Sequence, residues 1–149
     1  MDAVITLLIS AAPIAELRGG IPFALARGAG AEAAFFLAIA GNLAVIPALL
    51  FGLAAGERLI RRSAAGERFV DFAFGRIRRR GRLIDRYGPI GLFLLVAVPL
   101  PGTGVWTAAI GAHLFGIGPR RAALPIALGV LVAGLLVLSG SLGLIRLFG

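Results

Sequence analysis

Glu16 and Arg18 are two charged residues in the otherwise largely apolar first 27 residues of the chain. A charge at the centre of a membrane costs about 2.5–3.5 kcal/mol even on the most lenient scale, so each needs a partner or a function. Gly19-Gly20 permit a turn and Pro22 suits the start of a helix, so we expect a chain break over Glu16–Pro22. There the two charges either converge on a binding cavity or form a structural ion pair.

A second break is expected at Pro99-Leu100-Pro101-Gly102-Thr103-Gly104, within a long uncharged stretch. The turn exposes backbone amides, and Thr103 and Thr107 add hydroxyl groups. A helix that begins at each break points its N-terminus, worth about half a positive charge, toward the cavity beside Arg18. We therefore expect the cavity between the two breaks to attract an anion, with Glu16 as a group that can exchange protons.

Three further residues are candidates for roles at this cavity. Trp106 can stack on a substrate, gate the cavity or fill space. His113 is either a proton relay together with Glu16 or a polar packing residue. Asn42 can hydrogen-bond to the first break or to a second subunit. The full set of expected substrate- or ion-binding residues is Glu16, Arg18, Gly19, Gly20, Asn42, Pro101, Gly102, Thr103, Gly104, Trp106 and Thr107.

Enzymatic chemistry has no signature in the sequence. Nucleophile-elbow, zinc-protease, phosphate-loop and dinucleotide-binding patterns are lacking. With one histidine and no cysteine, a metal site is not expected either. We therefore expect a protein without enzymatic activity, metal or cofactor.

The composition indicates an all-α integral membrane protein. Of 149 residues, 59% are hydrophobic and 15% are charged, whereas soluble domains are about 25% charged. Ala33 to Ala55 and Ala122 to Ile145 carry no charge and are long enough to cross a membrane core of about 30 Å. These stretches predict transmembrane helices over 32–56 and 122–146.

The two remaining apolar blocks predict re-entrant helical hairpins. Tyr87 to Pro119 is uncharged, and this length makes about 50 Å of helix, too long for one span and too short for two. Two short arms that meet at the central break fit this length. We therefore expect re-entrant hairpins over 1–30 and 87–119. Each hairpin followed by one span forms one half of an inverted repeat, 1–56 and 87–149.

The net charge of +8 is interpreted as a topology signal and not as a nucleic-acid-binding surface. All fifteen basic residues are arginine, and ten of them lie between Arg58 and Arg86. The positive-inside rule places this segment and the pair Arg120/Arg121 in the cytoplasm, with both chain ends outside. The segment 57–86 is expected to be a basic amphipathic helix on the cytoplasmic leaflet. Its apolar face comprises Phe69, Val70, Ala73, Phe74 and Ile77.

A stripe of small residues predicts close helix packing in the first span, either within the chain or across a homodimer. These residues are Ala40, Ala44, Ala48, Gly52 and Gly56. We expect a homodimer, because one small chain can hardly shield two broken hairpins from lipid.

Three motifs resemble those of the bacterial and archaeal small multidrug export protein family. They are Glu16-Leu17-Arg18-Gly19-Gly20-Ile21-Pro22, Gly41-Asn42 and the stretch from Pro99 to Thr107. Arg120-Arg121 and the glycine-rich last span also fit, so the resemblance covers nearly the whole chain. Ala108 stands where the family usually has glycine. The resemblance implies a transporter.

The family is also distantly similar to the DedA (VTT-domain) membrane proteins, which have paired, opposed re-entrant hairpins. Some of those are implicated in returning undecaprenyl phosphate across the membrane. Glu16 would match their acidic residue and Pro101-Gly102 their Pro-Gly. The two arginines that flank Pro-Gly in DedA proteins fall at Val98 and Gly104 and are missing, so phosphate contacts would come from Arg18, Arg120 or Arg121.

These observations lead us to expect a multi-pass transporter in the cytoplasmic membrane of a prokaryote, with membrane lipids as partners and no nucleic acid. The favoured substrate is a phosphate-bearing lipid headgroup, such as that of undecaprenyl phosphate, moved in a proton-coupled way. The alternatives are an exporter of small hydrophobic cations, which Glu16 can bind, and a non-transporting membrane scaffold.

Overall fold

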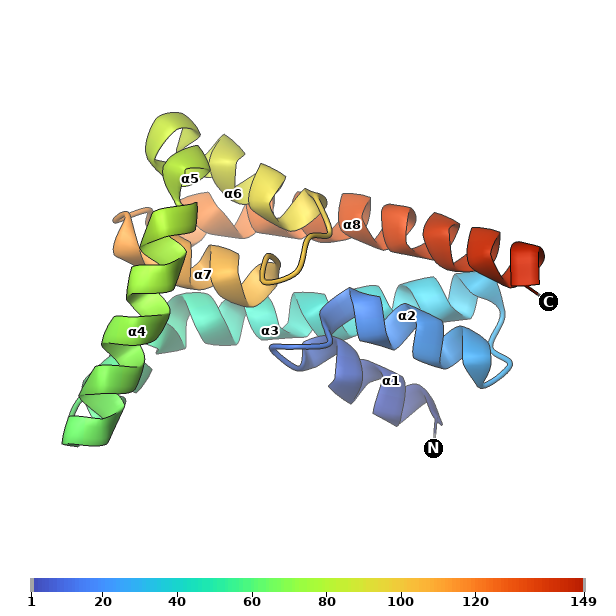
Figure 1. The fold of residues 1–149 in the computed structure, drawn as a ribbon, viewed down its shortest axis with the longest axis horizontal. Helices are drawn as coiled ribbons and strands as arrows, with labels where there is room; N and C mark the ends of the chain where they lie inside the picture. Colours follow the sequence, from blue (N-terminus) through green and yellow to red (C-terminus); the bar gives the residue numbers. More distant parts are fainter. Residues whose placement is uncertain (1, 149) are drawn as a thin grey trace.

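Two long helices set the length of the molecule. The computed structural model describes residues 2–148, and in this range the chain is all helical, without β-strands. Helices α3 (Ala31–Ile60) and α8 (Pro119–Phe148) have 30 residues each, about 45 Å of helix. They run antiparallel along the molecule (Figure 1).

Both long helices, α3 and α8, are long and apolar enough to cross a membrane. The predictions of an all-helical chain and of two long apolar helices are confirmed.

Four short helices form two pairs beside these long ones. The first pair is α1 (Asp2–Ala11) and α2 (Glu16–Ala26), and the second is α6 (Pro89–Ala97) and α7 (Val105–Leu114). The pairs extend inward from opposite ends of the molecule, and their tips meet about half-way along α3 and α8 (Figure 1). The site residues are therefore brought together in the middle of the bundle.

The second break lies where it was expected, over residues 98–104 between α6 and α7. The first break does not. Residues 12–15 form the turn, and Glu16 already begins α2, so the prediction of a break over Glu16–Pro22 is wrong. Pro13 ends α1, because proline cannot donate a helical hydrogen bond. Pro22 is accommodated inside α2.

Gly20, which suggested a turn, serves helix packing instead, and so does Gly41. A Cβ atom at Gly20 would collide with the Ser10 side chain of α1. A Cβ atom at Gly41 would lie 2.5 Å from the carbonyl oxygen of Leu7. These two glycines therefore let α1 approach α2 and α3 closely, and this holds the first tip against the bundle.

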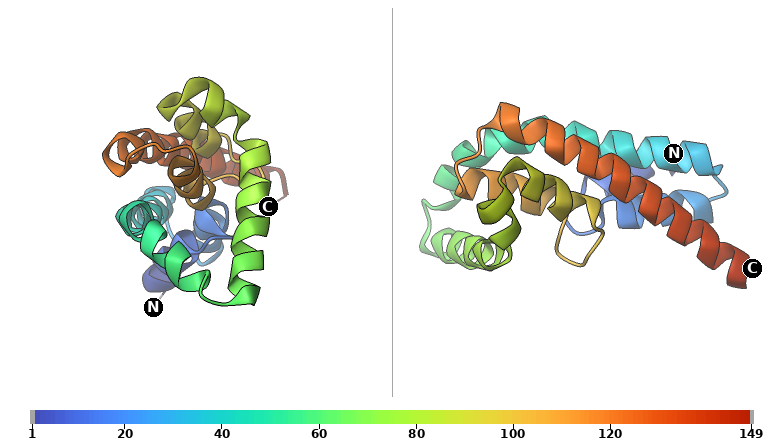
Figure 2. Two further views of the ribbon diagram at one scale, coloured as in Figure 1. Left: turned by 90° about the vertical axis from the view of Figure 1, so that its left-hand side faces the viewer. Right: turned by 90° about the horizontal axis from the view of Figure 1, so that it is seen from above.

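The basic segment 57–86 is divided, although one amphipathic helix was expected. Its first residues complete α3, and the rest forms α4 (Ala64–Arg80) and α5 (Arg82–Tyr87). Ser63 ends the preceding turn by accepting a hydrogen bond from the Gly66 amide at 3.0 Å, which caps α4. Helix α4 runs across the direction of α3 and α8 (Figure 2).

The predicted apolar face of α4 turns toward the protein and not toward lipid. Val70 and Ile77 are buried, and α4 packs against α7 and α3. Phe69, which was assigned to the same face, is 65% exposed. Turning this face inward covers the outer end of α7.

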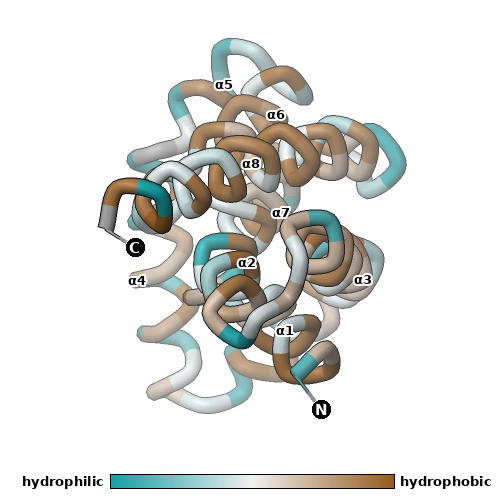
Figure 3. Tube along the Cα trace, turned by 90° about the vertical axis from the view of Figure 1, so that its right-hand side faces the viewer, coloured by the Kyte–Doolittle hydropathy of each residue, from teal (hydrophilic) through white to brown (hydrophobic). Residues whose placement is uncertain are grey.

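The outer surfaces of the long helices are apolar, as expected for contact with lipid. Figure 3 shows hydrophobic colouring along α3, α6 and α8, with hydrophilic residues on α4, on α5 and at helix ends. Among the small-residue stripe, Ala40, Ala44, Ala48 and Gly52 are exposed. The stripe therefore does not serve packing within the chain at these four positions, and a homodimer contact there stays a prediction.

Candidate functional site

The Glu16 carboxylate lies against the N-terminus of α7. Glu16 is only 8% exposed, and its Oε1 accepts a hydrogen bond from the Trp106 amide at 3.4 Å. The Val105 amide contributes a second backbone hydrogen bond. Since Gly104 has no side chain that can cap α7, Glu16 acts as the capping group from the other hairpin.

Gly104 makes this contact possible. Its φ of +135° is a conformation that residues with a Cβ rarely adopt. A Cβ atom there would also collide with the Glu16 carboxylate. The expected helix N-terminus therefore does point at the middle of the molecule, but a carboxylate of the chain itself already occupies it.

Arg18 also binds the second break. Its Nη2 donates to the Thr103 carbonyl oxygen at 2.8 Å and to Thr103 Oγ1 at 3.2 Å. Among the described residues, the side-chain hydrogen bonds of Glu16 and Arg18 therefore lead to the second hairpin, and the two side chains form no ion pair with each other. The alternative that we considered, an ion pair between Glu16 and Arg18 within the first tip, is not present. Each of the two side chains instead forms a hydrogen bond to the second tip.

The two expected threonines stabilise the break itself. Thr103 Oγ1 lies 2.8 Å from the Leu100 carbonyl oxygen and 3.0 Å from that of Val98, and it accepts a hydrogen bond from the Leu100 amide. Thr107 Oγ1 donates to the Gly102 carbonyl oxygen at 3.1 Å. Pro101 and Gly102 lie exposed in the turn. The hydroxyl groups therefore hold an irregular backbone.

Trp106 and Asn42 bind the opposite helix end, the C-terminus of α1. Asn42, which is 2% exposed, donates from Nδ2 to the Ser10 carbonyl oxygen at 2.8 Å. Trp106 donates from Nε1 to the Ala11 carbonyl oxygen at 3.1 Å. Carbonyl groups at a helix C-terminus lack helical partners, so these two side chains replace the missing donors. Of the roles considered for Asn42, the contact with the first hairpin is present.

The tips enclose a small internal cavity. Only about 10 Å³ of it is open to the centre of a water molecule, which is room for about one water. Its lining consists of Glu16, Leu17, Arg18, Asn42, Val96, Pro99, Gly104, Ala133 and Val137. In this conformation the site is closed, and a substrate fits only if the hairpin tips separate.

Gly19 and Gly20 lie next to this site without lining it. They are helical residues of α2 whose faces pack against Ile9 and Ser10 of α1. Their contribution is therefore to the position of Glu16 and Arg18.

His113, Arg120 and Arg121 lie away from the tips. His113 is in the last turn of α7, about 12 Å along the helix from the end that Glu16 caps. Arg120 and Arg121 are exposed in the first turn of α8, where they line a surface groove with Phe51. The structure thus separates His113 from Glu16 and both arginines from Arg18.

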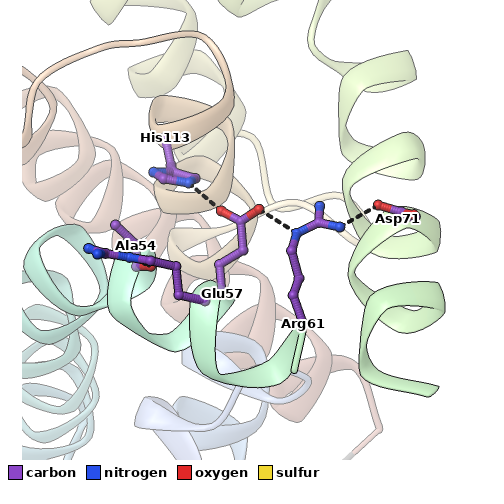
Figure 4. Close-up of polar contacts among 6 residues, drawn as sticks. Ala54, Glu57, Arg61, Asp71 and His113 are labelled. Atoms are coloured by element: carbon purple, nitrogen blue, oxygen red, sulfur yellow. Dashed lines mark hydrogen bonds and ion pairs between the residues drawn. The ribbon is translucent and has the colours of Figure 1, made fainter. Parts of the chain in front are cut away.

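His113 belongs instead to a polar cluster at the end of the molecule (Figure 4). Its Nε2 lies 2.7 Å from Glu57 Oε2. Arg61 binds Glu57 at 2.7 Å and Asp71 at 2.8 Å. Glu57, Arg61 and Asp71 were not predicted, because in the sequence they resemble the other charges of the basic segment.

Ser10 is a further residue that was missed. It is 1% exposed, and its carbonyl group is the acceptor for Asn42. A signal exists in the sequence, since Thr6 and Ser10 are two hydroxyl residues four positions apart in an apolar stretch. That spacing places both on one helix face.

The chain matches one family of known proteins. Residues 16–136 match the model of the family described as "Putative small multi-drug export protein". The matched range starts at Glu16 and contains both tips apart from the turn at 12–15. No curated protein and no solved structure matches the chain. The similarity to DedA proteins stays an expectation. With two helices able to cross a membrane and a family match over most of its length, this membrane protein belongs to the small multi-drug export protein family.

Proposed function

We propose that the chain exchanges a small hydrophobic organic cation for a proton across the membrane, and that both ligands use the Glu16 carboxylate. The observation that carries the proposal is that Glu16 is the one charged side chain classed as buried among the described residues. Ionisable residues inside membrane proteins mark ion and proton pathways. The family description, which names drug export, fits the same substrate class.

The arrangement of the short helices supports an alternating-access mechanism. Helices α1, α2, α6 and α7 have 9–11 residues each, about 14–17 Å, and so reach half-way through a hydrocarbon core. We interpret both pairs as re-entrant hairpins of an inverted repeat around one site at mid-membrane. Moving either hairpin opens the site to one side.

Three placements favour a cation over a lipid phosphate. The amides at the start of α7, which we expected to attract an anion, are bound to Glu16. Arg18 is bound to Thr103. Arg120 and Arg121 lie at the end of the molecule. The electrostatic argument for a phosphate-bearing lipid headgroup therefore loses its support, while the carboxylate that a cation needs is in the site.

A single carboxylate also sets the stoichiometry. A monovalent cation and a proton compete for the same group, so one is exchanged for one and no net charge crosses the membrane. A pH gradient is then expected to drive transport, and a membrane potential alone is not.

The test uses purified protein reconstituted in liposomes with ethidium as the cation. Wild-type protein is expected to accumulate ethidium when the lumen is acidic, and to show no accumulation under a potassium-diffusion potential at equal pH. Glu16→Gln removes the charge but keeps an oxygen that can accept from the Trp106 amide, so we expect transport to be lost while the fold is kept. The emission of Trp106, the single tryptophan, reports whether the tips stay together.

Glu32→Gln is the matched control, because Glu32 is an exposed glutamate at the start of α3. It should leave exchange unchanged. Accumulation driven by the potential alone, or full activity in Glu16→Gln, contradicts the proposal. A parallel assay follows the movement of undecaprenyl phosphate across the membrane of the same liposomes. If this lipid moves and ethidium is not exchanged, the substrate is the lipid phosphate and not the organic cation.

A further inference from the structure

The outward face of α4 combines arginines with exposed aromatic rings. Its residues are Arg68, Phe69, Phe72, Arg76 and Arg79. At 100° per residue, positions i, i+1, i+4, i+8 and i+11 share one side of a helix. That side is opposite Val70 and Ile77, which pack against the protein. Helix α4 therefore has an apolar side that packs against the bundle and an opposite side that carries arginines and phenylalanines.

Among the described residues, this outward face has no partner. Phe69 is 65% exposed and Phe72 is 70% exposed. Arg68, Arg76 and Arg79 form no ion pair with another described residue. Two acidic residues lie nearby: Asp71, which is bound to Arg61, and Glu67 in the first turn of α4. The three arginines outnumber them, so two exposed phenyl rings lie together with a net positive charge.

A glycine leaves a groove in this face. Gly75 has open space where a Cβ atom would be. The groove of about 320 Å³ around it is lined by Asp71, Phe72, Gly75, Arg76 and Arg79. Arg76 and Arg79 therefore line the same groove, together with Asp71 and Phe72. Because a guanidinium group binds phosphate oxygens in a bidentate manner, a phosphate group fits this pair.

The orientation of α4 indicates which phosphate. The two views in Figure 2 show α4 crosswise to α3 and α8, near the end of the molecule. If α3 and α8 cross the bilayer, α4 lies parallel to its surface. We propose that the outward face of α4 binds the headgroups of anionic phospholipids, with phosphate at Arg76 and Arg79 and the phenyl rings among the upper acyl chains.

The test measures lipid binding and not transport, so it is independent of the proposed function. Detergent-purified protein is mixed with phosphatidylglycerol or phosphatidylcholine, and retained lipids are counted by native mass spectrometry. We expect wild-type protein to retain phosphatidylglycerol preferentially. Arg76→Gln and Arg79→Gln should each weaken this retention by about fivefold.

Gly75→Leu tests the groove without changing the charge. Nothing lies within 4 Å of its Cβ position, so the variant should fold and lose retention. Gly140→Leu and Arg146→Gln are the controls, since both residues are exposed on α8, away from α4. Equal retention of both lipids overturns the proposal, as does an unchanged Arg76→Gln/Arg79→Gln double variant. Displacement by millimolar inorganic phosphate would identify an anion site without lipid specificity.

Discussion

The contact between Glu16 and the α7 N-terminus depends on the absence of a side chain at Gly104. Gly104→Ala places a Cβ atom against the carboxylate at a φ of +135°. Backbone strain of this kind costs about 1–3 kcal/mol, and the displaced carboxylate loses its amide partners. We expect lower thermal stability in detergent and loss of ethidium exchange.

Gly140→Ala provides the comparison for this variant. Gly140 is an interior residue of α8, in its C-terminal half, with open space around its Cβ position. Alanine is favoured over glycine in a helix by up to about 1 kcal/mol, so this variant should be as stable as wild type or more stable. Equal melting temperatures for Gly104→Ala and wild type would show that Glu16 does not need this position.

The sequence indicates which polar side chains would raise the free energy if they were placed in lipid without a partner. It does not indicate which groups they bind. Glu16, Arg18, Asn42 and Trp106 were all predicted for one site, and the structure brings all four to the two hairpin tips. Their partners are 32 to 95 positions away, and no local pattern specifies such pairs. Glu16 and Arg18 both line a cavity, as expected, but the sequence does not indicate that their polar groups bind the second hairpin. Their role as a binding site stays a prediction.

At the scale of elements, α7 is held at both ends by glutamates from other helices. Glu16 caps its first turn, and Glu57 of α3 binds His113 in its last turn at 2.7 Å. Since α7 is one arm of a proposed re-entrant hairpin, the Glu57 contact ties the outer end of that arm to α3.

The strength of this second contact can be measured by a double-mutant cycle of His113→Ala and Glu57→Gln. The side chains are 33% and 21% exposed, so solvent screens the pair, and we expect a coupling free energy of about 0.2–1 kcal/mol. The pair Arg27–Asp2, with exposures of 55% and 45%, is the control and should couple more weakly. Strictly additive effects of His113→Ala and Glu57→Gln would mean that the contact does not hold α7.

The positions of the helices could be predicted from the sequence where a residue pattern has one structural explanation. They could be predicted less well where the same pattern fits two structures. The long apolar stretches predicted α3 and α8, because a run of uncharged residues of that length forms a buried or lipid-facing helix. Gly19-Gly20 permits either a turn or close helix packing, and packing against α1 decided between them. In the same way, the apolar residues of α4 can face lipid or protein. The periodicity shows that such a face exists, but only the position of α7 determines its direction.

At the scale of the whole molecule, the arginines gather at one end. The segment 57–86 and the start of α8 carry 12 of the 15 arginines, and Figure 1 places these segments together, away from the loop between α2 and α3. From the positive-inside rule we predict that this end is cytoplasmic and that the α2–α3 loop is outside. In that orientation the two proposed hairpins would enter the membrane from opposite faces, which the proposed exchange mechanism requires.

This orientation can be tested because the chain contains no cysteine, so each introduced thiol is unique. Gly30→Cys lies in the α2–α3 loop and Gly75→Cys on α4, and both positions have open space around the Cβ atom. In intact cells, a membrane-impermeant maleimide should label Gly30→Cys and leave Gly75→Cys unlabelled until the cells are permeabilised. The reverse pattern would invert the topology and make the arginine-rich end external. Labelling of both positions in intact cells would mean that the chain inserts in both orientations, so that two copies expose opposite ends of the same exchange site. Labelling of a single position therefore determines which proposed hairpin opens outward and from which side a proton reaches Glu16, whereas labelling of both means that protons reach Glu16 from either side.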